Sequence, residues 1–215
     1  MQKILITTFI LCISFFLSWA NDSIDFHINN VPILKQPKSQ DCWATVITML
    51  VLWKTESISN QRVTSKDTKK IIGKTMQGVG PEWLTLYKNN LGLSTNQKDK
   101  LIKIFGFENE PPGNHTLEFY IDKLKQEGPL WVTTSTAPTG INSHAKLIVG
   151  VSGDMTYENT YIVFIDPLFG KLIKQKAIEF VKEFENEAIY IVQELIEKRK
   201  KTWEEVDFRI QVIHW

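Results

Sequence analysis

Apolar and polar positions divide the chain into two parts with different periodicity. In the first part, apolar residues from Trp43 onward recur at positions 43, 46, 47, 50 and 53, the spacing of a helix with one buried face. Asp41 stands just before this run, where an acid can cap free backbone N–H groups. Residues 56–115 add three more helical patterns, and we expect the middle one to close at Gly92. After a short extended lead-in at residues 21–35, the first part is therefore predicted to be mainly helical.

The pattern changes after residue 115. One more amphipathic helix is predicted over "TLEFYIDKLKQEG", with Thr116 as its cap and Gly128 at its end. Strands are then predicted over "PLWVTT", "HAKLIVGVSG" and "YIVFID", a further helix over "AIEFVKEFENE", and a final strand over "FRIQVIHW". This order predicts an α+β fold, with an N-terminal helical lobe and a mostly antiparallel C-terminal sheet lobe on either side of a cleft.

The first twenty residues have the form of a secretory signal. Lys3 precedes an apolar stretch, and Ser18 and Ala20 place small residues where a signal peptidase cleaves. An uncleaved anchor is the alternative, but the stretch is shorter than the roughly 20 apolar residues that span a bilayer. We expect residues 1–20 to be removed, leaving residues 21–215 as a single exported domain, secreted or periplasmic, without a stable membrane anchor.

Charge and cysteine content narrow the function further. The chain has 25 Lys and Arg against 24 Asp and Glu, so the loss of Lys3 with the leader leaves acids and bases in balance. This balance argues against a nucleic-acid binder, which needs a net basic face. Cys12 leaves with the leader, so Cys42 is the only remaining thiol and no internal disulfide can form. A single cysteine with a histidine elsewhere in the chain is typical of a catalytic nucleophile.

Four residues supply the parts that cysteine chemistry needs. Cys42 lies at the predicted N-terminus of a helix, where the positive end of the helix dipole favours a thiolate; a buried structural cysteine is the alternative. His144 begins a strand after a loop rich in Ser, Thr, Gly and Pro, and Asp166 ends the following strand. If those strands pair, Asp166 can accept the imidazole N–H, although each could instead be an ordinary loop or turn residue. Gln36, six residues before Cys42, could stabilise an oxyanion.

At this point the sequence resembles a known family. The segment "QPKSQDCWA" is similar to the Gln–five residues–Cys–Trp pattern of papain-like cysteine proteases. The segments "GPLWV", "SHAKLIVGVSGD" and "YIVFIDP" resemble the compact bacterial branch, above all its AvrRpt2-like peptidases. A weaker likeness links the chain to the peptidase domain that trims double-glycine leaders from bacteriocins. The resemblance covers roughly residues 31–170 and assigns no role to residues 171–215.

The resemblance implies a papain-like fold, a protein or peptide substrate and no cofactor. It assigns Cys42 as nucleophile, His144 as general base and then acid, Asp166 as the residue that orients His144, and Gln36 as oxyanion donor. Cys42 and His144 are 102 residues apart, fewer than the roughly 130–150 of papain itself. This spacing, the missing disulfides, the short segment before Gln36 and the Asp as third member all favour the compact branch, without control by a propeptide.

Other functions remain open on the same residues. The site could cut cell-wall peptides or transfer acyl groups to amines, or the fold could be an inactive binding module. The last is disfavoured because all four catalytic residue types are present. We expect a monomer and no metal site, since no cluster of Cys and His has ligand spacing, and we assign no role to His27, His115 and His214.

Overall fold

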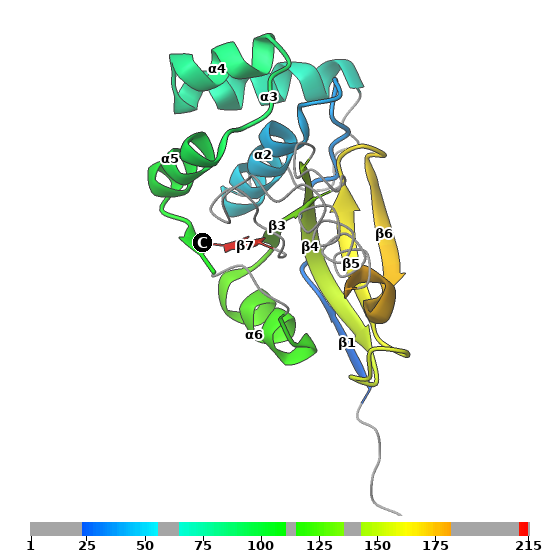
Figure 1. Ribbon diagram of the computed structural model, residues 1–215. Coiled ribbons are helices and arrows are strands. Elements are labelled where there is room, and N and C mark those ends of the chain that lie inside the picture. The colour runs from blue at the N-terminus through cyan, green and yellow to red at the C-terminus, as the bar shows by residue number, and fades with distance from the viewer. Residues whose placement is uncertain (1–22, 56–64, 111–114, 136–142, 182–210, 215) are drawn as a thin grey trace, which may run out of the picture.

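In the computed structural model, helices pack against one antiparallel sheet (Figure 1). The structure describes residues 23–55, 65–110, 115–135, 143–181 and 211–214. The helices are α2 (Cys42–Lys54), α3 (Ser65–Val79), α4 (Pro81–Lys88), α5 (Thr95–Phe105) and α6 (Leu117–Glu127). The strands are β1 (Ile24–His27), β2 (Glu108–Asn109), β3 (Leu130–Ser135), β4 (Ser143–Gly153), β5 (Tyr161–Asp166), β6 (Lys171–Lys176) and β7 (Gln211–His214). The predicted α+β class is confirmed.

The sheet is antiparallel at every pairing among the described residues. Its strands run in the order β2-β7-β3-β4-β5-β6, and β1 pairs with β4 outside this path. The lead-in thus supplies a strand, β1. The sequence did not predict β6, because this strand is largely exposed and its segment, "KLIKQK", lacks the apolar alternation of a half-buried strand. The predicted leader and most of residues 177–215 lie outside the described residues, although residues 177–181 form the expected helical turn.

The observed ends of two helices can be compared with the ends predicted from the sequence. Thr116 caps α6 as predicted, since its side chain accepts a hydrogen bond from the backbone N–H of Phe119 at 3.2 Å. The prediction that Gly92 closes the preceding helical pattern was wrong, because α4 already ends at Lys88. Asn90 has a left-handed φ of 55°, a conformation that residues other than Gly and Asn rarely adopt, and it turns the chain before Gly92 is reached.

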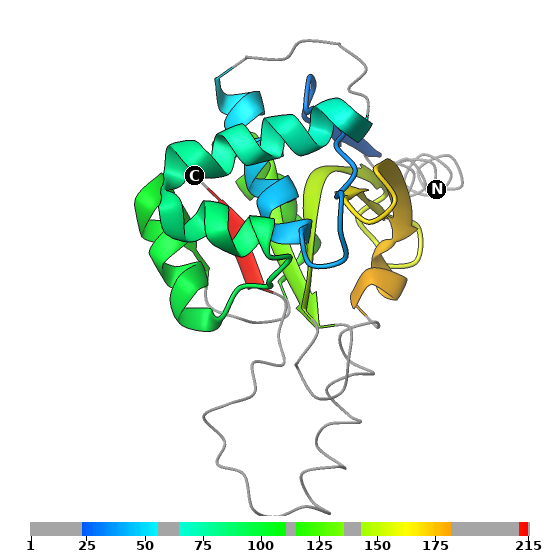
Figure 2. The ribbon, with the colours of Figure 1, turned by 90° about the horizontal axis from the view of Figure 1, so that it is seen from above.

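The core lies on both faces of the sheet. On one face, β4 and β5 pack against α2, which is itself covered by α3, α4 and α5 on its far side (Figures 1 and 2). On the other face, alternate residues of the same strands pack against α6. The sequence predicted one buried face for α2, yet nine consecutive residues from Cys42 to Leu50 are buried. A helix that is enclosed in this way is held rigidly, which matters because its first residue is the candidate nucleophile.

Within the described residues, none of the helices has the length and apolar character that crossing a membrane requires. The single-domain boundary at residue 21 stays a prediction.

Candidate active site

Cys42 is the first residue of α2 and is 8% exposed. Two contacts fix this end of the helix. The Asp41 carbonyl accepts hydrogen bonds from the Thr45 backbone N–H at 3.0 Å and from the Thr45 hydroxyl at 2.8 Å. The indole of Trp43 donates to the Leu91 carbonyl at 3.1 Å, which ties the helix to the loop after α4. The thiol is therefore held at a defined place in the first turn, where backbone N–H groups stabilise negative charge.

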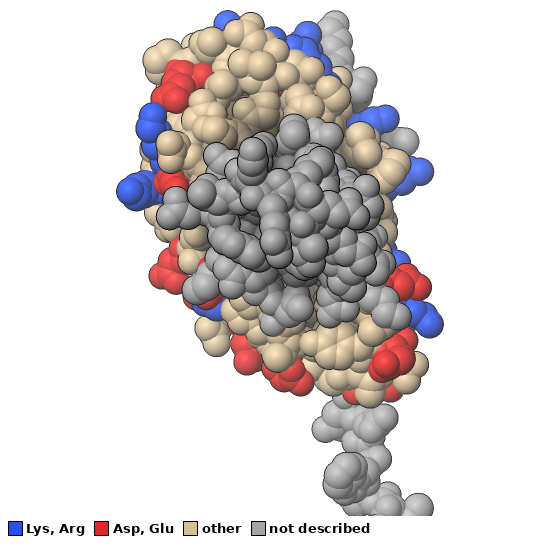
Figure 3. Space-filling view, viewed as in Figure 1, with Lys and Arg blue, Asp and Glu red and all other residues tan. Residues whose placement is uncertain are grey.

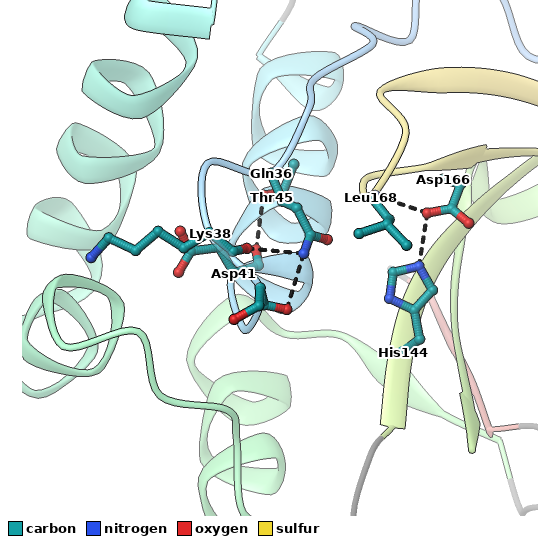
Figure 4. Close-up of polar contacts among 8 residues, drawn as sticks. Gln36, Lys38, Asp41, Thr45, His144, Asp166 and Leu168 are labelled. Atoms are coloured by element: carbon teal, nitrogen blue, oxygen red, sulfur yellow. Dashed lines mark hydrogen bonds and ion pairs between the residues drawn. The ribbon is translucent and has the colours of Figure 1, made fainter. Parts of the chain in front are cut away.

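His144 and Asp166 meet because β4 and β5 pair in a particular register. Leu147 lies opposite Ile165, so His144 is a diagonal neighbour of Asp166 on the same side of the two strands. The His144 Nε2 and Asp166 Oδ1 atoms are 2.8 Å apart, and the backbone N–H of Leu168 donates to the same oxygen at 2.8 Å (Figure 4). The contact expected between these two strand ends is present.

The imidazole is bonded on both sides. Asp166 engages Nε2, and a second side-chain hydrogen bond joins the ring to Cys42, for which Nδ1 is the ring nitrogen left. Burial alone would lower the pKa of His144, but the bonds to Asp166 and Cys42 outweigh it and raise the pKa to about 9. Burial likewise would raise the pKa of Asp166, and the bond from His144 reverses this and lowers it. The arrangement therefore favours an imidazolium between the Asp166 carboxylate and the sulfur of Cys42 at neutral pH.

Gln36 connects the two halves of the site. Its backbone N–H donates to the Pro167 carbonyl at 2.8 Å, next to Asp166. Its side-chain Nε2 donates to the carbonyls of Lys38 at 2.9 Å and Ser39 at 3.0 Å, which closes the turn that leads to Cys42. The Oε1 atom is buried without a partner among the described residues. The amide of Gln36 thus shapes the turn, and both of its N–H groups are already engaged.

A comparison with protein families bears directly on this geometry. The family described as papain-like cysteine protease AvrRpt2 matches residues 25–187, which include all four candidate residues. The chain belongs to this family. It is a papain-like cysteine protease, a hydrolase whose substrates are proteins or peptides. The resemblance stated from the sequence is confirmed, while the roles of the four residues stay predictions. A comparison with curated proteins found no match.

Asp41 corrects one expectation about this papain-like site. It precedes α2, but its backbone (φ −88°, ψ 6°) is not in the extended conformation of a capping residue, and its side chain caps nothing. The carboxylate is fully buried, and within the described residues neither oxygen accepts a hydrogen bond of regular geometry. Burial raises its pKa to about 6, and the opposing influence of Lys38 and Lys69 does not cancel this rise. Sequence alone gave no signal for a buried, unpartnered acid beside the nucleophile.

The protease also carries a cluster of metal-ligand type that sequence spacing did not suggest. Ligand atoms of Glu108, Glu110 and His214 lie within 4.8 Å of one another, brought together by the pairing of β2 with β7. The Lys123 ammonium lies 2.6 Å from Glu110 Oε1, and His214 Nε2 lies 2.9 Å from the same oxygen. The bond from Lys123 is the main cause that lowers the pKa of Glu110. The Lys123 ammonium thus supplies the positive charge beside the Glu110 carboxylate.

Proposed function

We propose that this protease is an exported enzyme that hydrolyses peptide bonds through a thioester on Cys42. The observation that carries the proposal is the hydrogen-bonded chain from Cys42 through His144 to Asp166 at the head of α2. A nucleophile, a base within reach of it and a third group that orients the base are the parts that this chemistry needs.

The proposed reaction starts from an ion pair in which the proton of Cys42 has passed to His144. In the first half, the thiolate sulfur bonds to the substrate carbonyl carbon. The carbonyl oxygen takes up the negative charge. When this oxyanion collapses, the C–N bond breaks and His144 gives its proton to the departing amine. Because the pKa of His144 is raised to about 9, the imidazolium is available as the acid at neutral pH.

In the second half, neutral His144 takes a proton from water as the water oxygen attacks the thioester carbon. The C–S bond then breaks, the acid product leaves and the thiolate returns beside the imidazolium. Asp166 keeps the ring in the tautomer that leaves Nδ1 facing Cys42 in both halves.

We assign the oxyanion to the backbone N–H of Cys42 and to the side chain of Gln36. For Gln36 this assignment carries a condition, since its Nε2 already donates to Lys38 and Ser39. One of these two bonds must be exchanged for the oxyanion as charge develops. The buried position of Gln36, 7% exposed, keeps water from competing for that hydrogen.

The nucleophile is tested with Cys42→Ala, which should lose peptide hydrolysis while its circular dichroism matches that of the parent. The exposed pair of His27 and Asp25 offers a control, because His27→Ala should keep full activity. An unfolded protein substrate and purified peptidoglycan are digested side by side, so release of wall peptides alone would replace the proposal with the cell-wall alternative. Undiminished hydrolysis by Cys42→Ala would remove Cys42 from the reaction.

Iodoacetamide labelling separates an enzyme from an inactive binding module. In the proposed enzyme, the rate of Cys42 alkylation at pH 7 depends on His144, and His144→Ala should slow it by roughly tenfold or more. Equal labelling rates in parent and variant would favour the binding module.

We also propose export, supported by Lys3, the apolar stretch after it and the small residues Ser18 and Ala20. N-terminal sequencing of the protein recovered from outside the cytoplasm should give a chain that begins at Asn21. We expect that chain to be a monomer by light scattering. Recovery of the full-length chain in the membrane fraction would contradict the export proposal.

A further inference from the structure

A groove of about 720 Å³ lies between α3 and α4, and none of the candidate catalytic residues lines it. Half of its lining residues are lysines and none is acidic; the lining consists of Lys69, Lys70, Gly73, Lys74, Gln77, Leu84, Tyr87 and Lys88. Such a concentration is notable in a chain whose formal net charge is only +1. In the space-filling view, basic atoms lie along the upper edge, where Figure 1 places α3 and α4, and acidic atoms lie at the upper left as well as lower on the molecule (Figure 3).

The four lysines of the groove form no ion pair within the described part of the chain, although Lys69 lies near enough to Asp41 to lower its pKa. None of their ammonium groups has a carboxylate partner there, whereas Lys100 pairs with Glu82 and Lys123 pairs with Glu110. Lys70 and Lys74 are four residues apart on α3 and therefore stand on the same face of the helix. Like charges held side by side repel each other, and an anionic ligand relieves that repulsion.

The floor of the groove is apolar and preformed. Gly73 faces α4, and a Cβ atom there would lie at an ordinary van der Waals distance of 3.6 Å from the Tyr87 ring. The Tyr87 hydroxyl donates to the Lys69 carbonyl at 3.1 Å, which fixes the two helices to each other. With Leu84 beside Tyr87, the groove offers room for an apolar side chain under a cationic rim.

One end of the groove adjoins the catalytic turn. The Lys38 ammonium donates to the Lys88 carbonyl at 2.8 Å, and Lys38 is the residue whose own carbonyl holds the Gln36 amide (Figure 4). Asp41 is close enough to Tyr87 and Lys69 for their charges to influence one another. A polypeptide lying in the groove could therefore continue toward the head of α2.

We propose that this groove docks an acidic segment of the protein substrate, one that also carries an apolar side chain, at a distance from the bond that is cut. The proposal rests on the proposed peptidase function and names a substrate feature for it. Nucleic acid fits less well, because the basic surface is one short groove rather than an extended face. An anionic membrane fits less well because the lysines line a concavity rather than a flat surface.

Binding is measured with the Cys42→Ala chain, so that turnover does not interfere. Fluorescence anisotropy follows a labelled peptide of alternating Glu and Leu, and a matched peptide with Gln in place of Glu is the control ligand. We expect the acidic peptide to bind more tightly and to weaken as salt rises. Lys70→Glu with Lys74→Glu should weaken it about tenfold or more, whereas Lys103→Glu on exposed α5 surface should not. Equal binding of the two peptides, or tighter binding of duplex DNA or phosphatidylserine vesicles through the same lysines, overturns the proposal.

Kinetics with the active chain separates this proposal from the proposed function. Two peptide substrates share one cleavable core, and each carries either the acidic or the Gln extension. The ratio of their kcat/KM values should favour the acidic substrate and should fall toward one in the Lys70→Glu, Lys74→Glu chain. If neither substrate is cut while the acidic peptide still binds, the peptidase function fails and the groove stands. If both are cut equally by parent and variant, the docking proposal fails and the peptidase function stands.

Discussion

Two aspartates are buried at the candidate active site, the candidate catalytic residue Asp166 and the residue before Cys42, Asp41, and their surroundings affect them in opposite ways. Asp166 at the end of β5 is 4% exposed, and Asp41 at the head of α2 is fully buried. Asp166 accepts hydrogen bonds from His144 and from the Leu168 backbone, and its pKa is lowered. Asp41 has no such partner among the described residues, and burial raises its pKa to about 6. The same residue type at similar depth is thus held as a carboxylate in one place and pushed toward the neutral acid in the other.

The difference teaches that partners, rather than depth, decide the charge of a buried acid. The turn after β5 offers a backbone N–H and the adjacent strand offers an imidazole, so two donors compensate for the loss of water. At the head of α2 the backbone conformation of Asp41 keeps its side chain from the free N–H groups of the first turn. Asp166 is thus held as a carboxylate that supports His144. Asp41 has no such donors, and its burial costs stability when the group ionises.

The largest effect is expected from Asp166→Ala, which removes the favourable side of this comparison. We expect kcat/KM to fall by roughly 10²–10⁴-fold, because His144 loses both its orientation and its charge partner. The pKa of His144 is raised to about 9 by its partners, so the imidazolium persists up to that pH. Without Asp166 this pKa falls, and the alkaline limb of the pH–rate profile should move to lower pH.

Exposed Asp122 on α6 provides the control for this experiment, since Asp122→Ala should leave both the rate and the pH profile unchanged. An alkaline limb that stays in place in Asp166→Ala would show that Asp166 does not set the charge of His144.

The sequence predicted the contact of Asp166 with His144, which is present, but its prediction that Asp41 caps α2 was wrong. Asp166 ends one apolar strand and His144 begins another. These positions were enough to predict their contact, because antiparallel pairing places the start of one strand beside the end of the next. The role of Asp41 as a helix cap depended on its φ and ψ angles, which residue type does not determine. The cap at Thr116 was predictable because there the backbone is extended, at φ −73° and ψ 166°.

The fold shows the same limit. Helices and buried strands follow from apolar spacing, whereas the exposed edge strand β6 has no such pattern. The all-round burial of α2 depends on the packing of α3, α4 and α5, which no local pattern reports. The lysine groove likewise arises only where α3 and α4 pack together.

Gln36 bonds to Pro167, which follows Asp166, and to the turn before Asp41, and Gln36→Ala tests whether it acts on the reaction or only on the turn. Loss of an oxyanion donor should lower kcat by roughly 10²-fold while KM changes little. Loss of the bonds to the Lys38 and Ser39 carbonyls should also lower the melting temperature. A lower melting temperature with unchanged kcat would limit Gln36 to a positioning role between Asp41 and Asp166.

A smaller effect, of opposite sign, is expected from Asp41→Asn. The pKa of Asp41 rises from 3.8 to about 6 on folding, so the folded state is disfavoured as the group ionises. Above pH 6 this difference corresponds to about 3 kcal/mol, and it vanishes only well below pH 3.8, where the acid is neutral in both states. Asp41→Asn should therefore be more stable than the parent at pH 7, and urea unfolding should show this gain shrinking to zero as the pH falls below 3.8.

The control for that series is Asp122→Asn. Because the Asp122 side chain is exposed, the unfolding free energy of this variant should vary with pH in the same way as that of the parent. Curves for Asp41→Asn and the parent that run parallel from pH 4 to pH 7 would contradict a raised pKa for Asp41.

The smallest effect is expected from Lys38→Met, which removes the largest of the influences that oppose the raised pKa of Asp41. The pKa of Asp41 should then rise further. The loss of stability therefore begins at the same pH as in the parent but continues to a higher pH, and in the end it exceeds that of the parent by less than about 1 kcal/mol. Lys38 also donates to the Lys88 carbonyl, and losing this bond changes stability equally at every pH. A double-mutant cycle separates the two, because the pH-dependent part must disappear when Lys38→Met is made in the Asp41→Asn chain. If it persists there, the charge that Lys38 compensates is not that of Asp41, and the contrast with Asp166 needs another explanation.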